Sequence, residues 1–437
     1  MTHQENSTTK AVYRYTYDTL GRLMGSSQTG SVNLRASYGY DTNSRLKSFT
    51  YSIPGVIDSA SQTYYYNGDA GESNTDDYSD GVLLSMSLFS NAWLNYRYDT
   101  LSRLSERDVG GILTEHYTYT PGEGAETTTT LPQQLYTTRK GSSTSLGGYT
   151  YIYDNMGNIT RATDVVTEYY WAYSYNAQGQ LRYSTYYNKN GVAQERYYYY
   201  YDNAGNLTKR QERDSAGQNV LKEHVLVYGH TEWKDMIKTV DGRALTYDAS
   251  GNPLSYYNGA DYTMTWRNGR QLSTIATGGK TYSYEYDANG LRTRRTNSDG
   301  GYTLYYIVDG LTVGEQQYTA SGSIRRTMKY LLDENNSPVG VSVRYPSYSA
   351  GTWDNLLFCQ EPAGGRHCPL PLEWNKYRHA GGHLQVRSLG QAHWHLQRQR
   401  RNHLPDSRQC GRLQPLPLPG LPLRRGYRVL LPEDQVL

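Results

Sequence analysis

The stretch Tyr199–Leu207 reads YYYDNAGNL and contains the pattern that decides the fold: alternate tyrosines, an aspartate, and a glycine three residues after that aspartate. Tyrosines two residues apart project from the same face of a β-strand. The aspartate opens a turn, because its carboxylate can accept hydrogen bonds from backbone N–H groups just ahead. Glycine or asparagine follows where the turn needs a positive φ, and Leu207 starts the returning strand. This stretch is therefore predicted to be a β-hairpin with a tight turn.

The same pattern returns along residues 11–353 as aromatic-x-Tyr-Asp-x-x-Gly-x-Leu, with local variants. The other copies are YTYDTLGRL (Tyr15–Leu23), YGYDTNSRL (Tyr38–Leu46), YRYDTLSRL (Tyr96–Leu104), YIYDNMGNI (Tyr151–Ile159), YSYNAQGQL (Tyr173–Leu181), LTYDASGNPL (Leu245–Leu254), MTWRNGRQL (Met264–Leu272) and YEYDANGLR (Tyr284–Arg292). An isolated hairpin is marginally stable in water, so neighbouring copies are expected to pair into one continuous sheet. The predicted fold class is all-β, repetitive and extended.

Each copy contributes strand and turn positions to which we assign structural roles. They are Tyr17, Asp18, Gly21, Tyr40, Asp41, Tyr98, Asp99, Tyr153, Asp154, Gly157, Tyr175, Gly179, Tyr201, Asp202, Gly205, Tyr247, Asp248, Gly251, Trp266, Tyr286, Asp287 and Gly290. The repeated aspartates could also be interpreted as catalytic carboxylates or calcium ligands. One aspartate per repeat at a turn favours the structural role.

Composition supports strands built around tyrosine rings. The chain has 47 Tyr against 3 Phe and 7 Trp, and hydrophobic residues make up only 37%. A core of Leu, Ile, Val and Phe is expected to be poorly supplied, with rings buried between strands and their hydroxyls near water. Disorder is disfavoured because disordered chains contain few aromatic residues. The net charge of +3 is too small to indicate nucleic-acid binding.

The ends of the chain bear on its location. No apolar stretch approaches the roughly 20 residues of a membrane span, and the N-terminal residues lack the pattern of a signal peptide. The chain is therefore expected to be either cytoplasmic or a piece of a longer exported protein. Residues 1–10 are predicted to be a disordered start.

The repeats resemble the YD or RHS repeats of bacterial Rhs and wall-associated polymorphic toxins, insecticidal toxin-complex C components and teneurins. The resemblance covers about residues 11–350 and includes YIVDGLTVGEQ (Tyr306–Gln316) and MKYLLDENNSPVGV (Met328–Val341). It implies a strand spiralling into a hollow shell (YD-shell), incomplete here, that encloses a toxic C-terminal segment or presents an adhesive surface. It also implies secretion or surface anchoring of the intact protein, whose export signal this chain does not contain.

The composition changes abruptly after Trp353. Residues 354–437 contain all 3 cysteines of the chain but only two of its 47 tyrosines. Read one nucleotide out of frame, the codons allowed for Cys410–Leu437 permit AADYNPYRYRGYLYDEDTGFYYLKTRYY, which resembles the end of the RHS core. We interpret residues 354–437 as an out-of-frame, mostly irregular tail, with one extra nucleotide at the Trp353 codon. Any toxin segment of the intact protein is then lost from this chain.

Several alternative sites are weighed against simpler explanations. Cys359, His367, Cys368 and Cys410 could suggest zinc, but their spacing fits no usual ligand pair. His393 and His395 with Arg398, Arg400 and Arg401 could suggest nucleic-acid binding, and an accidental translation explains both groups better. The four histidines of residues 1–353, which are His3, His116, His224 and His230, lie in no nucleophile motif.

The sequence therefore predicts a non-catalytic scaffold fragment with no cofactor and no metal. The expected partner is the missing C-terminal toxin segment of the intact protein, with no nucleic acid and no membrane span. The alternative is a cell-surface adhesion or carbohydrate-binding module, because tyrosine-rich repeats near 20 residues also occur in glucan-binding proteins. Those repeats favour Gly-Trp and Trp-Tyr pairs, which this chain replaces with the Asp-x-x-Gly turn.

Overall fold

The computed structural model describes residues 2–5, 8–30, 32–68, 81–88, 92–122, 124, 127–229, 233–349, 351–358, 371–375 and 385–388. These residues form strands and turns, which confirms the predicted all-β class. Among them, no helix has the length and apolar character needed to cross a membrane. The chain divides into two compact units, residues 1–168 with 263–389 and residues 169–262 with 390–437.

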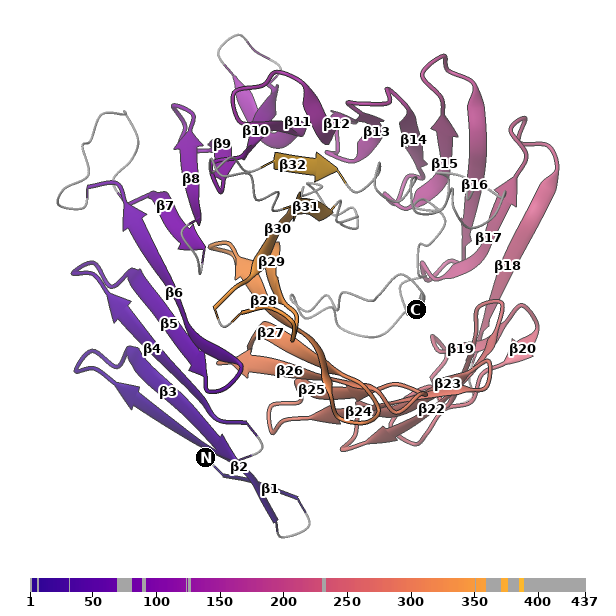
Figure 1. Cartoon of the computed structure of the whole chain (residues 1–437). Helices are drawn as coiled ribbons and strands as arrows, with labels where there is room; N and C mark the ends of the chain where they lie inside the picture. The colour runs from indigo at the N-terminus through magenta and orange to yellow at the C-terminus, as the bar shows by residue number, and fades with distance from the viewer. Residues whose placement is uncertain are drawn as a thin grey trace. The chain divides into compact units, whose positions relative to one another are not determined.

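The N-terminal part of the first unit is an antiparallel meander in which each strand pairs with its neighbours in sequence (Figure 1). Its strands are β1 (Thr2–Glu5), β2 (Thr8–Tyr17), β3 (Leu23–Gly30), β4 (Leu34–Tyr40), β5 (Leu46–Ile53), β6 (Ile57–Tyr66), β7 (Leu83–Leu88), β8 (Ala92–Tyr98), β9 (Leu104–Val109), β10 (Leu113–Pro121), β11 (Thr128–Arg139), β12 (Ser145–Tyr153) and β13 (Ile159–Asp164). Residues 1–10 were predicted to be a disordered start. The described residues among them instead form β1 and the start of β2, and these two strands pair with each other. That expectation was wrong for the residues described there, because β1 gains backbone partners from β2.

The C-terminal part of the first unit continues in the same way, from β23 to β32. Its strands are β23 (Gln271–Thr277), β24 (Lys280–Tyr286), β25 (Arg292–Thr296), β26 (Tyr302–Val308), β27 (Leu311–Tyr318), β28 (Ile324–Leu332), β29 (Pro338–Arg344), β30 (Asp354–Phe358), β31 (Pro371–Asn375) and β32 (Gln385–Ser388). Strand β22 (Asp261–Arg267) spans the boundary between the two units.

The second unit is a further antiparallel meander from β14 to β20. Its strands are β14 (Tyr170–Tyr175), β15 (Leu181–Tyr187), β16 (Ala193–Tyr201), β17 (Leu207–Arg213), β18 (Val220–Tyr228), β19 (Ile237–Val240), β20 (Arg243–Ala244) and the short β21 (Ser255–Tyr257). Its small apolar cluster contains Leu226, Ile237, Val240 and Leu245. The aromatic rings of β14–β16 pack mainly against one another; the Trp171 and Tyr186 centroids, for example, are 5.0 Å apart.

A β-bulge recurs where most repeats enter their turn. In β16 and β17, Tyr200 pairs with Lys209 but Tyr201 pairs with Leu207, so Thr208 is the extra residue. The same shift occurs at six other copies. A bulge bends its strand and increases the local twist. Each of these hairpins is therefore bent at the same position of the repeat.

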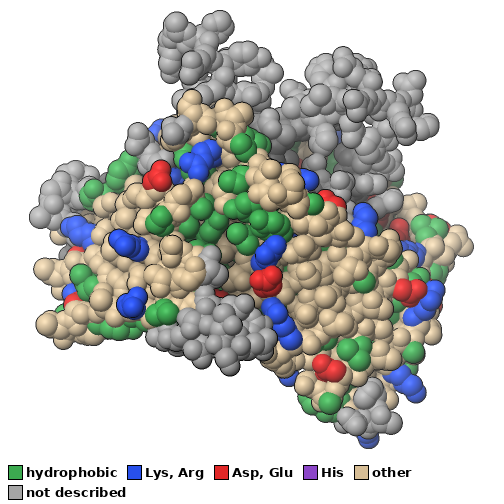
Figure 2. Space-filling view, turned by 60° about the horizontal axis from the view of Figure 1, so that its bottom comes forward, with side chains coloured by type: hydrophobic (Ala, Val, Ile, Leu, Met, Phe, Trp, Pro, Cys, Tyr) green, Lys and Arg blue, Asp and Glu red, His purple; other side chains and the backbone are tan. Residues whose placement is uncertain are grey.

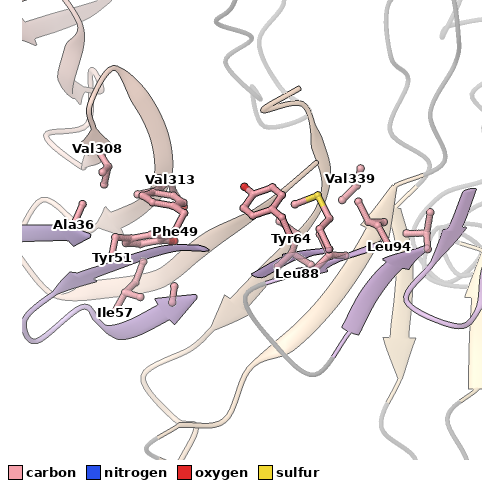
Figure 3. Packing of buried hydrophobic residues seen from close by; sticks show 14 of the residues in the cluster. Ala36, Phe49, Tyr51, Ile57, Tyr64, Leu88, Leu94, Val308, Val313 and Val339 are labelled. Atoms are coloured by element: carbon pink, nitrogen blue, oxygen red, sulfur yellow. The ribbon is translucent and has the colours of Figure 1, made fainter. Parts of the chain in front are cut away.

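The first unit has a core where strands β4–β10 meet strands β26–β30, which lie about two hundred residues later in the chain (Figure 3). Figure 3 shows Phe49, Tyr51 and Ile57 on one side and Val308 and Val313 on the other. The largest side chains that are less than 2% exposed are Tyr51, Ile53, Ile57, Met86, Leu88, Leu94, Leu113, Leu331, Val109, Val240, Val308 and Val313. All but Val240 belong to this unit, and each such side chain contributes about 1.5–3 kcal/mol through burial. The expectation of a poorly supplied aliphatic core was wrong here, because the few aliphatic residues are concentrated on these strands.

Polar contacts also join the two groups of strands. The Gln62 side-chain amide donates to the carbonyl oxygen of Leu332 at 2.7 Å. The Arg344 guanidinium donates to the carbonyl oxygen of Val56 at 2.9 Å. Because these buried groups are satisfied across the interface, they fix the register between strands distant in sequence.

The change of composition at Trp353 does not coincide with the end of the sheet. Strand β30 begins at Asp354 and pairs with β29, and Leu357 is 2% exposed in the core. Beyond Phe358 only the backbones of β31 and β32 are described, and the other residues of the tail lie outside the described part of the chain. The irregular, out-of-frame tail therefore stays a prediction.

Figure 2 shows one face of the molecule, where Lys, Arg, Asp and Glu side chains are scattered among uncharged polar surface. Charges of both signs are interspersed on this face. This distribution agrees with the small net charge of +3.

Candidate functional site

The repeated feature of this fold is the turn that follows each Tyr-Asp pair. In the Asp202 copy, Asp202 Oδ1 accepts the backbone N–H groups of Ala204 at 2.9 Å and Asn206 at 2.8 Å. Its other oxygen, Oδ2, accepts the side-chain amide of Asn206 at 3.0 Å. The Gly205 N–H donates to the Asp202 carbonyl oxygen at 3.1 Å, which closes the turn. One carboxylate thus organises the loop between two strands.

Five other copies repeat this geometry, and in each the side chain four residues after the aspartate binds Oδ2. It is arginine in the first three copies, where Arg22, Arg45 and Arg103 bind Asp18, Asp41 and Asp99. It is asparagine in the copies of Asp154 and Asp248. In the Asp287 copy, Oδ1 accepts two backbone N–H groups at 2.9 Å. Tyr175 is followed by Asn176, whose side-chain oxygen accepts the Gln180 N–H at 2.9 Å.

The fourth turn residue has a positive φ in each of these copies. Glycine occupies it as predicted at Gly21, Gly157, Gly179, Gly205, Gly251 and Gly290. In the Asp41 and Asp99 copies the residue is serine, Ser44 with φ 63° and Ser102 with φ 57°. The expectation of glycine or asparagine does not hold at these two turns, because the carboxylate network holds a backbone conformation that serine disfavours.

The hydrogen bonds of the turn also set its electrostatics. The side-chain amide of Asn206 and then its backbone N–H lower the pKa of Asp202 below its ordinary value. Asn158 and Asn252 lower the pKa of Asp154 and Asp248 in the same way. The turn aspartates therefore stay ionised at neutral pH and act as acceptors.

A second recurring contact joins each repeat to the one before it. A tyrosine, which directly precedes the turn aspartate in six of nine pairs, donates its hydroxyl to a backbone carbonyl of an earlier strand; we call this hydrogen bond the tyrosine clamp. The donor and acceptor pairs are Tyr40 and Leu23, Tyr66 and Leu46, Tyr98 and Leu83, Tyr119 and Leu104, Tyr153 and Pro132, Tyr201 and Leu181, Tyr228 and Leu207, Tyr247 and Ile237, and Tyr286 and Leu272. Their oxygens lie 2.6–3.0 Å apart. These hydroxyls were expected near water and instead bind the backbone, which corrects that expectation.

In the first repeats the turn and the tyrosine clamp share an arginine. The Arg45 guanidinium, which binds Asp41, lies 4.3 Å from the ring centroid of Tyr66 in the next copy. Arg22 lies over Tyr40 at 4.8 Å, and Arg103 over the Tyr119 ring at 4.1 Å. Cation–π contact of this kind contributes about 0.5–1 kcal/mol at exposed sites. Tyr17, in the first copy, is 61% exposed, and no hydrogen bond of its hydroxyl is found among the described residues.

The Trp266 copy departs from the pattern. Its turn is the tighter pair Asn268 and Gly269, both with positive φ, and it has no carboxylate. Trp266 is half-buried on β22. The following Arg267 lies over the Tyr286 ring at 5.7 Å, so the contact between copies is retained.

The same turn occurs at positions that the motif did not identify. A hydrogen bond from the fourth to the first turn residue closes the loops that begin at Asn188, Asp214, Asn297, Thr319 and Asp333. Four of these five loops contain glycine as their fourth residue. The shorter signal of Asn, Asp or Thr followed by x-x-Gly, without the tyrosine, would have found those four.

The other candidate residues form no shared site in the described part of the chain. His116 Nε2 lies 3.0 Å from Thr138 Oγ1, and His224 Nδ1 lies 2.7 Å from Asp241 Oδ2. Among the described residues, no group of three or more His, Cys, Asp or Glu side chains could hold a metal ion. The side chains of His3, His230, Cys359, His367, Cys368, His393, His395, Arg398, Arg400, Arg401 and Cys410 lie outside the described residues.

Turn-locked hairpins joined by tyrosine clamps define a class of protein, the strand-shell scaffold. Residues 266–302 match the family model RHS Repeat. A search of curated proteins finds no match. The chain is similar to the crystal structure of TcdB2-TccC3-Cdc42, with 14% identity over 83% of this chain and 17% of that chain, and a TM-score of 0.52. The Photorhabdus luminescens Tc holotoxin pore is matched at 14% identity over 83% of this chain and 22% of that chain, with a TM-score of 0.41.

The first of these likenesses supports the predicted fold, antiparallel strands of the YD-shell type. Together with the RHS Repeat match at residues 266–302, it supports the resemblance to RHS-repeat (YD-repeat) proteins that the motif predicted. The chain spans 17% of the length of the TcdB2-TccC3-Cdc42 chain.

Proposed function

We propose that this chain is part of the wall of a shell that encloses or displays a C-terminal toxin or adhesive segment of the intact protein. The observation that carries the proposal is the recurrence, among the described residues, of turn-locked hairpins and of nine tyrosine clamps that join later strands to earlier ones. The similarity of fold to the structure of TcdB2-TccC3-Cdc42 also supports the proposal.

The wall itself is proposed to be non-catalytic. Its repeated carboxylates are occupied by backbone and side-chain donors of their own turns, as Asp202 is by Ala204 and Asn206. A general base needs a free lone pair within reach of a substrate proton. The intact protein is proposed to be secreted or held at the cell surface.

The first experiment is to sequence the source DNA across the Trp353 codon and a few hundred bases beyond the codon for Leu437. We expect a recoverable frame that encodes the rest of the RHS core and a new C-terminal domain. The uninterrupted protein is then produced and digested with a protease. The C-terminal domain should resist digestion in the shell and be cut rapidly when it is produced alone.

Equal digestion rates in both settings would favour display over enclosure. A downstream frame with no further RHS sequence would contradict the out-of-frame interpretation of the tail. Hydrolysis of nucleic acid or glycan by the purified chain would contradict the non-catalytic wall.

A second candidate function is the binding of a surface glycan, and it rests on a polar hollow of about 540 Å³ on β8–β11. Its lining includes Arg97, Asp108, His116 and Lys140, with hydroxyl groups between them. The His116 ring stacks on Tyr136 with centroids 4.6 Å apart. Paired charges, hydroxyls and a neighbouring ring are groups that can bind the hydroxyls and the apolar face of a sugar.

Glycan-array binding by the chain would test this candidate. Binding should weaken in Arg97→Ala and His116→Ala and persist in Arg182→Ala, a change at an exposed arginine of the second unit. Absence of binding to any glycan, or equal loss in all three variants, would exclude the hollow as the site.

A further inference from the structure

The turn between β28 and β29 keeps the Oδ1 contacts of the other repeat turns but has a different partner for Oδ2. The backbone N–H groups of Asn335 and Ser337 donate to Asp333 Oδ1 at 3.0 and 2.8 Å. The residue four positions after the aspartate is Ser337, where six of the motif copies have arginine or asparagine and the Asp287 copy has Leu291. Asp333 Oδ2 instead accepts Arg107 Nη1 at 3.0 Å, from a residue 226 positions earlier in the chain.

Arg107 lies in a buried polar cluster between β9, β10 and this turn. Arg107 is 3% exposed, Glu115 5% and Asp333 4%. Arg107 Nε donates to Glu115 Oε2 at 2.8 Å, and the Tyr117 hydroxyl donates to the same oxygen at 2.8 Å. One guanidinium therefore joins two carboxylates from strands and a turn that are far apart in sequence.

A third carboxylate borders the cluster. The Tyr96 hydroxyl, from β8, donates to Glu334, the residue after Asp333. The titratable groups that face the turn are Tyr64 on β6, Tyr96 on β8, Arg107 on β9, and Glu115 and Tyr117 on β10. With Asp333 and Glu334 this makes three carboxylates against one arginine, so the cluster carries surplus negative charge when all are ionised.

We propose that Arg107 holds the β28–β29 turn in place by binding Asp333 Oδ2, which the side chain of Ser337 does not bind. We call this contact the arginine clamp. The additional carboxylate of Glu334 makes the clamp more stable in mild acid than at neutral pH. The clamp holds the C-terminal strands β26–β30 on the N-terminal sheet. Arg107 can bind Asp333 Oδ2 because Ser337, four positions after Asp333, does not bind that oxygen.

The direction of the pH effect follows from the environment of Glu334. Burial and then the neighbouring charge of Asp333 raise the pKa of Glu334 above its ordinary value. A carboxyl group whose pKa is raised on folding contributes its full stability below the unfolded pKa, and that stability is lost as pH rises through the folded pKa. Raising the pH into the neutral range therefore places a third negative charge beside Asp333 and loosens the turn.

Hydrogen exchange of the backbone amides 333–337 in the full chain tests the clamp. Arg107→Gln should speed their exchange by about tenfold or more, because it leaves two buried carboxylates without their cation. Ser337→Asn supplies the missing partner, as Asn206 does for Asp202, so Arg107→Gln should cost much less in the Ser337→Asn background. Arg103→Gln is the matched control, since Arg103 binds Asp99 within its own turn, and it should affect only amides 99–103.

An equal effect of Arg107→Gln with and without Ser337→Asn would overturn the clamp. If Arg107→Gln fails to fold, folding of the double variant Arg107→Gln/Ser337→Asn supports the clamp, and failure of both overturns the idea that Arg107 replaces a turn partner. For the pH effect, protection of amides 333–337, corrected for intrinsic exchange, should fall about threefold or more between about pH 5 and about pH 8. Glu334→Gln should abolish this fall, and an unchanged fall in that variant would refute the role of Glu334.

Discussion

The tyrosine clamp predicts a specific loss of stability when one hydroxyl is removed. The Tyr66 hydroxyl donates to the Leu46 carbonyl oxygen at 2.9 Å, and the Arg45 guanidinium lies over the Tyr66 ring. Tyr66→Phe keeps the ring and removes only the hydrogen bond, so the free energy of unfolding should fall by about 1 kcal/mol. Tyr66→Ala also removes the ring that contacts Arg45 and the apolar surface it covers, so the total loss should be about 3 kcal/mol.

Urea denaturation of the full chain measures these losses, and hydrogen exchange of amides 41–45 locates them. Tyr17→Phe is the matched control, because Tyr17 ends β2 as Tyr66 ends β6, and no hydrogen bond of its hydroxyl is found among the described residues. It should leave the free energy of unfolding unchanged within about 0.5 kcal/mol. If Tyr66→Phe and Tyr17→Phe have equal effects, or if exchange in the Asp41 turn does not change, the tyrosine clamp does not couple neighbouring repeats.

Four further outcomes are expected. Leu94→Ala, at a side chain with no exposed surface, should lower the free energy of unfolding by about 3 kcal/mol in urea denaturation. Gly179→Ala should cost about 1 kcal/mol because Gly179 has φ 75°, whereas Ser44→Gly at φ 63° should stabilise by a similar amount; thermal melts of the two variants should shift in opposite directions. In acid, the turn stability that depends on a lowered carboxyl pKa, such as that of Asp248, is present above the unfolded value and is lost as pH falls through the folded value, so circular dichroism should report unfolding below about pH 4, and Asp248→Asn should lessen the local change seen by hydrogen exchange. In alkali, burial raises the pKa of Tyr305 to about 12, so the stability it contributes is present below about pH 10 and is lost as pH rises towards 12; tyrosinate absorbance should appear together with unfolding, and a fully reversible titration at pH 10 in the folded state would contradict this.

The repeat turns could be predicted from the sequence because their chemistry is local. Asp202, Gly205 and Leu207 lie within six residues, and the carboxylate binds donors that immediately follow it. The positive φ of Ser44 and Ser102 was not expected. It occurs because the conformational preference of a single residue is weaker than the network of hydrogen bonds in the turn. The strand pairing followed in turn, because each hairpin places its neighbour alongside.

The contacts between segments distant in sequence could not be predicted from the repeat. The bulge at Thr208 depends on how two strands leave the turn, and the tyrosine clamp depends on a carbonyl about twenty residues earlier. The core between β4–β10 and β26–β30 depends on which strands meet. Arg107 gave no signal in the sequence, because its partner Asp333 is distant and the turn of Asp333 lacks the Tyr-Asp pair.

Every tyrosine clamp points backwards along the chain, since the hydroxyl belongs to the later repeat and the carbonyl to the earlier one. A ribosome releases the earlier repeat first. Each newly made hairpin therefore meets an acceptor that is already in place and need not wait for sequence still to be translated. We expect the sheet to form during synthesis by the addition of one hairpin at a time from its N-terminal end. A chain halted partway would then contain a shorter sheet of folded repeats.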